Sequence, residues 1–180
     1  MTEVKLYIGP MFAGKTSKLI TTYNKYNSIE GHKTIAIKPN IDNRYETNKI
    51  KSHDGDYIPA YEIDIDNKDF NFLAEYDSVF IDEIQFFTHP HNLLNVAFNN
   101  DVNLYMYGLS GTFNLNTFST ISKIIPYCTH IELFKSICYN CGEVANYSKK
   151  IIKRETDKLN EIEIGGSELY KPSCYACMQL

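Results

Sequence analysis

The chain has 180 residues, enough for one domain with a sizeable core, and its 43% hydrophobic and 22% charged residues are ordinary for a globular protein. Its net charge of −4 argues against a nucleic-acid partner, because proteins that coat nucleic acid carry a basic patch and a high pI. No apolar run is long enough to span a membrane, and residues 1–3 lead into a strand-like run without a secretory signal. We therefore expect a cytoplasmic protein with no membrane partner.

The first expected unit is a strand, a glycine loop and a helix. Residues 4–8 form an apolar run that predicts a buried strand, and residues 17–29 lack proline and glycine and predict a helix. Between them lies a match to G-x-x-x-x-G-K-[ST], formed by Gly9, Pro10, Met11, Phe12, Ala13, Gly14, Lys15 and Thr16. In such a loop the backbone N–H groups surround the β-phosphate, Lys15 places a cation between the β- and γ-phosphates, and Thr16 offers a hydroxyl to Mg²⁺. A glycine-rich turn is the alternative, but the flanking strand and helix favour a site for a nucleoside triphosphate with Mg²⁺.

The next segments alternate between strands and polar connections. Residues 33–38 predict a second strand, which Pro39 closes because proline cannot donate to a β-ladder. Residues 40–56 are polar and predict a long functional loop, although its Ser52–Asp56 stretch fits a solvated turn equally well. A strand over 57–63 and a short helix over 69–75 follow.

A second chemical signal comes at residues 78–83, an apolar run that ends in two carboxylates. This pattern is typical of a central parallel strand that delivers an acid to the C-terminal edge of the sheet. Asp82 suits the acid that supports Mg²⁺ opposite a phosphate loop, and Glu83 points elsewhere and can act on a nucleophile. The alternative is that both residues only begin a solvated loop.

The remaining segments of this part continue the alternation. We expect helices over 92–99 and 118–125, strands over 102–107 and 131–137, and a glycine-rich connection over 108–113. Such alternation predicts an open α/β architecture with a mostly parallel sheet. We therefore interpret residues 1–137 as a P-loop nucleotide-binding domain.

The last segment, residues 138–180, contains two C-x-x-C pairs, made by Cys138 with Cys141 and Cys174 with Cys177. Four thiolates in two close pairs predict a closed, structural Zn²⁺ site in a small lobe, with a β-hairpin and an extended loop between the pairs. A redox-active dithiol is the alternative. Cys128 stands alone and is interpreted as a buried apolar thiol.

Several of these stretches together resemble one family. They are GPMFAGKT (9–16), IDEIQFF (81–87), Gly-Thr-Phe (111–113), the paired C-x-x-C motifs and IGG-x₃-Y (164–170). The chain resembles, from Val4 to Cys177, the thymidine kinases of the tetrameric, zinc-containing type. The resemblance implies a RecA-like P-loop sheet, a zinc lobe with a lasso loop, and transfer of the ATP γ-phosphoryl group to the 5′-hydroxyl of thymidine. It also implies a homotetramer and feedback binding of thymidine triphosphate.

The resemblance also implies roles for individual residues. Glu83 takes the place of the catalytic base, and Asp54 and Gln85 lie beside the nucleotide and its metal. The nucleoside is expected to contact three aromatic walls, the backbone of the lasso loop and a closing tyrosine. These residues are Phe86, Phe113, Phe118, Glu161, Ile162, Glu163, Ile164, Gly165 and Tyr170.

The sequence departs from the family pattern at three places. Ser110 stands where relatives often have an acidic residue or Asn, residues 114–117 are uncharged where many relatives are basic, and Gly55 stands where some have a basic residue. Among other classes, a nucleic-acid-dependent ATPase would need a second motor lobe and a basic track. A zinc-ribbon binding module leaves the phosphate loop unexplained, and a GTPase would carry Asn-Lys-x-Asp. A kinase of the same fold acting on deoxyuridine or another pyrimidine deoxynucleoside is the closest alternative.

Overall fold

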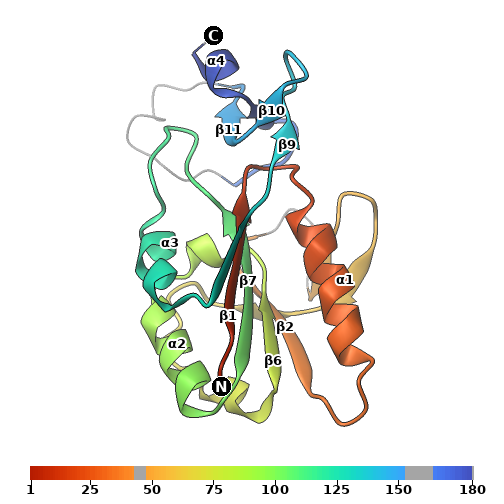
Figure 1. Cartoon of the computed structure of the whole chain (residues 1–180), viewed down its shortest axis with the longest axis vertical. Coiled ribbons are helices and arrows are strands. Elements are labelled where there is room, and N and C mark those ends of the chain that lie inside the picture. Colours follow the sequence, from red (N-terminus) through yellow and green to blue (C-terminus); the bar gives the residue numbers. More distant parts are fainter. Residues whose placement is uncertain (43–47, 153–163, 180) are drawn as a thin grey trace.

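The computed structural model describes residues 1–42, 48–152 and 164–179. Its main part is a six-stranded sheet with helices on both faces, and a small lobe of short strands lies at one end (Figure 1). The strand order is β5-β2-β6-β7-β1-β8, and every pairing in this sheet is parallel. The expected α/β architecture is confirmed. The strands are β1 (Val4–Gly9), β2 (Thr34–Pro39), β5 (Tyr61–Ile63), β6 (Ser78–Ile81), β7 (Asn103–Leu109) and β8 (His130–Leu133).

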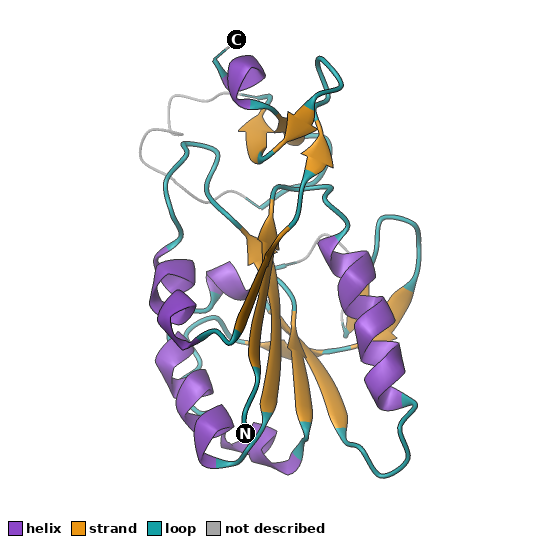
Figure 2. Ribbon diagram, viewed as in Figure 1, coloured by secondary structure: helices purple, strands orange, loops and turns teal. Residues whose placement is uncertain are grey.

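Alternation along the central strands builds a separate core on each face of the sheet. Helix α1 (Lys15–Asn27) covers one face, and α2 (Pro90–Asn99) and α3 (Ser119–Ile124) cover the other (Figure 2). In β7, Leu104 and Met106 pack with the α2 and α3 side, whereas Tyr105 and Tyr107 pack with the α1 side. Successive side chains of a strand point to opposite faces, so this one strand supplies both cores.

Two expected strands are each divided in the structure. The segment 57–63 forms β4 (Tyr57–Pro59), which pairs with β3 (Lys49–Lys51), and β5, which joins the main sheet. The break lies at Ala60, whose N–H donates to the carbonyl of Asn48 at 3.0 Å. The prediction of a loop over residues 40–56 was therefore wrong at Lys49–Lys51, which form β3.

The expected strand 131–137 is divided between two sheets. The last hydrogen bond between this segment and β1 runs from the Phe134 N–H to the Ile8 carbonyl at 2.7 Å, just after the parallel pairing of β8 with β1. The chain then enters β9 (Ser136–Ile137), which pairs with β10 in the small lobe. The pairing of the small lobe thus begins before residue 138, and the division of the chain at 137 stays a prediction.

The helices are close to expectation, with small shifts at their ends. Helix α1 begins at Lys15, directly after the left-handed Gly14, and α2 begins at Pro90, a position that suits proline because the first helical N–H has no partner. The segment 69–75 forms a 3₁₀ helix, η1 (Asn71–Glu75). Two further 3₁₀ turns are η2 (Ile84–Phe86) and η3 (Ile125–Tyr127).

The small lobe consists of β9 to β12 and the short helix α4 (Tyr175–Met178). Strand β9 pairs with β10 (Val144–Ala145), and β11 (Tyr147–Lys150) pairs with β12 (Tyr170–Ser173), both antiparallel. Among the described residues of the lobe, the buried apolar cluster contains Cys138, Ala145 and Cys177, with Cys174 packed against it. A core this small rarely holds a unit together without a metal or a disulfide. In the described part of the chain, no helix combines the length and apolar character that crossing a bilayer requires.

Candidate active site

The loop between β1 and α1 has the backbone geometry of a phosphate cradle. Phe12 and Gly14 have positive φ angles of 61° and 78°, and Gly14 immediately precedes the first residue of α1. Such turns aim successive N–H groups into one concavity at a helix N-terminus, where an anion is stabilised. Lys15 is buried, and its Nζ donates to the carbonyls of Gly9 at 3.2 Å and Pro10 at 2.6 Å. The loop thus holds a cation and backbone donors in one place.

The two acids expected at the end of β6 lie at the same edge of the sheet as this loop. Only β7 separates β1 from β6, and all three strands run parallel, so their carboxyl ends lie side by side. Asp82 and Glu83 are buried, and Asp82 Oδ1 accepts a hydrogen bond from the Glu83 N–H at 3.1 Å. Glu83 has φ 51° and ψ 42°, a left-handed conformation that costs a non-glycine residue roughly 1–2 kcal/mol. Strain of this kind gathers at functional sites.

Gln85 connects Glu83 to the neighbouring strand. Its Nε2 donates to Glu83 Oε2 at 2.5 Å, and its Oε1 accepts from the N–H of Leu109 at 3.1 Å. Gln85 is 4% exposed, so both bonds lie away from solvent. Gly108 makes this arrangement possible, because a Cβ there would collide with the amide oxygen of Gln85. The carboxylate of Glu83 is therefore held in one orientation from the end of β7.

An open cleft with a volume of about 110 Å³ lies over these groups. The phosphate loop and the two acids line it, together with Lys38, Lys49 and Lys51 from the β2 and β3 side. Lys38 is 3% exposed and pairs with Glu62 at 3.2 Å. Four lysines, counting Lys15, and three carboxylates, Asp42, Asp82 and Glu83, line the cleft, so cations suited to a polyphosphate lie beside acids suited to its metal ion.

The 52–56 stretch reaches this cleft through a residue other than the expected one. His53 lines the cleft, and its ring lies 5.3 Å from that of Phe12. Asp54 is exposed and is not among the residues that line the cleft.

The expected nucleoside walls form two aromatic pairs. Phe86 and Phe118 meet edge to face with ring centroids 6.3 Å apart, and Phe113 lies 6.2 Å from Tyr170 of β12. The Nζ of the buried Lys150 lies 5.0 Å above the Phe113 ring. Ile164 and Gly165 of the expected lasso loop are described and half-buried, whereas Glu161, Ile162 and Glu163 lie outside the described residues.

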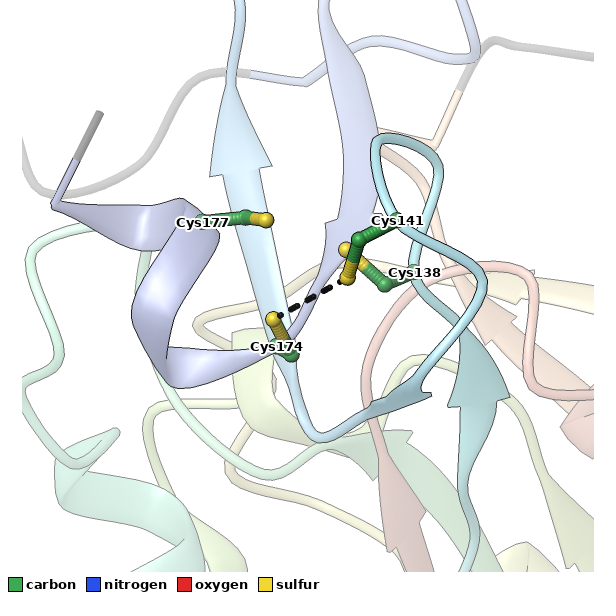
Figure 3. Close-up of side chains that lie close together, drawn as sticks. All are labelled: Cys138, Cys141, Cys174 and Cys177. Atoms are coloured by element: carbon green, nitrogen blue, oxygen red, sulfur yellow. Dashed lines mark hydrogen bonds between the residues drawn. The ribbon is translucent and has the colours of Figure 1, made fainter.

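The four paired cysteines converge in the small lobe (Figure 3). Their Sγ atoms all lie within 4.8 Å of one another, and Cys141 Sγ is 3.6 Å from Cys174 Sγ. Zn–S bonds of about 2.3 Å require tetrahedron edges of about 3.8 Å, so the cluster fits a zinc ion. The cysteine cluster can therefore hold a metal.

Comparison with known proteins identifies the family. A family model described as thymidine kinase matches residues 2–178. The chain belongs to the thymidine kinase family. A thymidine kinase of Amsacta moorei entomopoxvirus is 35% identical over 97% of both chains. Thymidine kinases of Pseudothermotoga lettingae and Pyrobaculum aerophilum are 31% and 33% identical, over 97% and 93% of this chain and 94% and 93% of their own lengths.

For this member of the thymidine kinase family, the structure brings Lys15, Asp82 and Glu83 to one cleft. Gln85 is hydrogen-bonded to Glu83, and Phe113 lies beside Tyr170. Sequence reasoning found Lys15 but missed the other cleft residues Lys38, Lys49, Lys51 and His53, and also Lys150. Lys38 alone carried a usable signal, because it stands near the carboxyl end of a strand that pairs with β6. The others follow no local pattern.

Proposed function

We propose that this chain is an ATP-dependent thymidine kinase, which transfers the γ-phosphoryl group of ATP to the 5′-hydroxyl of thymidine and yields thymidine monophosphate. Its family supports this assignment. The observation that carries it is Glu83, a buried carboxylate fixed by Gln85 beside the phosphate loop and Lys15. A kinase needs a base for its acceptor and a cation for the transferred group, and this cleft supplies both.

In the proposed reaction Glu83 accepts the proton of the 5′-hydroxyl while that oxygen attacks the γ-phosphorus in line. The hydrogen bond from Gln85 keeps the carboxylate aimed at the acceptor. Lys15 and the N–H groups of the loop neutralise charge on the phosphates. Thr16 and Asp82 would hold the Mg²⁺ of Mg·ATP, which supplies further neutralisation of that charge. Positioning dominates, because phosphoryl transfer asks little covalent chemistry of the protein.

Thymidine is proposed to bind among the aromatic side chains. Phe86, Phe113, Phe118 and Tyr170 supply flat apolar surface for the base and sugar. The lasso, residues 161–165, would read the edge of the base through backbone groups. A wrong base would leave such a group unpaired, which costs about 1–3 kcal/mol.

The remaining assignments concern the zinc ion, the assembly and the cellular setting. Zn²⁺ in the four-cysteine site would hold the small lobe together. The proposal of a homotetramer that binds thymidine triphosphate as a feedback ligand rests on the family resemblance. Strand β8 at the edge of the sheet supports an assembly, because its Ile131 and Leu133 are 44% and 57% exposed. Five free cysteines suit a reducing cytoplasm, where the product would supply DNA synthesis by salvage.

The test is transfer of the γ-phosphoryl group from Mg·ATP to thymidine, followed through formation of thymidine monophosphate. The wild-type chain should form the product, and Lys15→Ala should abolish it because the phosphate cation is lost. Lys18→Ala is the matched control, since Lys18 is an exposed lysine on the same helix. A fully active Lys15→Ala would remove the phosphate loop from the mechanism.

A further inference from the structure

The small lobe is hydrogen-bonded directly to the phosphate loop. The N–H of Met11 donates to Ser148 Oγ of β11 at 2.9 Å, and this bond is buried. The hydroxyl of Ser136 in β9 donates to the carbonyl of Phe12 at 3.0 Å. Two adjacent residues of the loop are thus held from two different strands of the lobe.

These bonds act on the part of the loop whose backbone is least favourable. Phe12 has φ 61°, a conformation that side chains with a Cβ adopt rarely and at a cost of roughly 1–2 kcal/mol. Gly14, two residues later, is also left-handed. These two left-handed residues turn the backbone so that the N–H groups of the loop point inward. A strained conformation persists only where neighbouring structure holds it. Ser148 holds the peptide unit that precedes the Met11 Cα, and Ser136 holds the peptide unit that follows the Phe12 Cα.

Each serine is also close along its strand to a cysteine pair. Ser136 lies two residues before Cys138 in the same stretch of chain. Ser148 pairs across the hairpin with Pro172, which lies two residues before Cys174. The Pro172 carbonyl in turn accepts from the Tyr139 N–H at 2.9 Å, which joins the two stretches. The metal-binding cluster and the loop are therefore connected through short, hydrogen-bonded strands.

The connection passes close to the start of the loop as well. A Cβ at Gly9 would lie 2.6 Å from the carbonyl oxygen of Phe134, so the chain entering the lobe runs against the last residue of β1. The connection from β8 to the lobe is therefore packed against the start of the loop.

We propose that Ser136 and Ser148 are positioning residues that hold the phosphate loop in its ATP-binding conformation, and that the four-cysteine lobe thereby sets the affinity for ATP. This inference rests on the proposed kinase function. It gives the lobe a role on the phosphate side of the reaction, in addition to the nucleoside side assigned to the lasso. ATP affinity and thymidine affinity should therefore respond differently when a serine hydroxyl is removed.

The experiment measures binding of Mg·AMP-PNP by calorimetry, and the KM values for ATP and thymidine, in full-length Ser136→Ala. Loss of one hydrogen bond of this kind should weaken AMP-PNP binding and raise the ATP KM about five- to tenfold. The thymidine KM and the kcat at saturating ATP should stay within about twofold. Ser136→Thr, which keeps the hydroxyl, should bind AMP-PNP within about twofold of wild type.

Ser28→Ala is the matched control. The Ser28 hydroxyl also donates to a backbone carbonyl, that of Lys25 at 2.8 Å, but it lies at the far end of α1 from the phosphate loop. It should change neither nucleotide affinity nor KM. Zinc content and melting temperature are measured on every variant, and Ser148→Ala repeats the AMP-PNP test from the second strand if Ser136→Ala does not fold.

AMP-PNP affinity within twofold of wild type in a folded, zinc-loaded Ser136→Ala or Ser148→Ala overturns the proposal. An equal loss of thymidine and nucleotide affinity in Ser136→Ala also overturns it, since that indicates a lobe that has only loosened. AMP-PNP binding needs no phosphoryl transfer, so the result is separate from the kinase assignment. That assignment fails instead if the wild-type chain phosphorylates no thymidine.

Discussion

Gly108 lies outside every site motif, yet the structure predicts that Gly108→Ala reduces turnover. The added methyl group would collide with the side-chain amide oxygen of Gln85 and would lie 2.9 Å from Ile84 Cγ2. Gln85 is 4% exposed and Ile84 is fully buried, so neither side chain has open space to enter. Overpacking of this kind costs about 1–3 kcal/mol, which corresponds to a fall in Tm of roughly 2–12 °C for a chain of this size.

The effect on catalysis follows from what Gln85 holds. A displaced Gln85 gives up its bonds to Glu83 Oε2 and to the Leu109 N–H, and the carboxylate is no longer oriented. A shift of about 1 Å in a catalytic group can cost 10²-fold, so we expect kcat to fall about 10- to 100-fold. The KM for ATP should change less than about threefold, because the phosphate loop belongs to another strand.

The assay combines steady-state kinetics with thermal unfolding, and Gln85→Ala supplies the control. Removing the amide removes the main clash, so the two substitutions should be less than additive in both kcat and Tm. A Gly108→Ala variant with wild-type kcat and Tm would refute the reasoning. Fully additive effects would show that the glycine acts independently of Gln85.

Three further predictions follow from the same geometry. Glu83→Gln should lower kcat by roughly 10²-fold or more while leaving AMP-PNP affinity near normal, as lost general-base catalysis does, and near-normal turnover would remove Glu83 from the mechanism. Cys138→Ser should release zinc and lower the Tm, because three of the four cysteines and Ala145 make up the small apolar cluster seen in the described part of the lobe, with the fourth cysteine outside it; unchanged zinc content and melting would contradict a structural ion. Burial raises the pKa of Cys128 to about 11, so at pH 8 iodoacetamide should alkylate it about 10²-fold more slowly than a free thiol in the folded protein, and rapid labelling would show that the thiol is accessible.

The parts of the site that sequence predicts are those built from neighbouring residues. The phosphate loop lies within eight consecutive positions, and Glu83 and Gln85 are two residues apart at the end of one strand. The spacing of these residues in the sequence is therefore enough to predict that they lie close together. The two C-x-x-C pairs are each local as well, and zinc chemistry supplies the reason for them to meet.

The parts that sequence does not predict depend on pairing between distant strands. Ala60 lies within an alternating run, and the run is divided there because β4 pairs with β3, β5 pairs with β2, and the Ala60 N–H bonds to Asn48. Lys150 lies in the same strand as Ser148, and its partner in the neighbouring strand, Tyr170, is far along the chain. No periodicity marks such residues, because their positions follow from tertiary contacts rather than local pattern.

The central claim is that this chain phosphorylates thymidine, and one assay tests it most directly. Purified protein with Mg·ATP is offered thymidine, deoxyuridine and deoxycytidine side by side, and nucleoside monophosphate and free phosphate are both measured. The account predicts transfer to thymidine with the highest kcat/KM of the three. ATP hydrolysis without transfer to any nucleoside would contradict it, and a clear preference for deoxyuridine or deoxycytidine would contradict the assigned substrate.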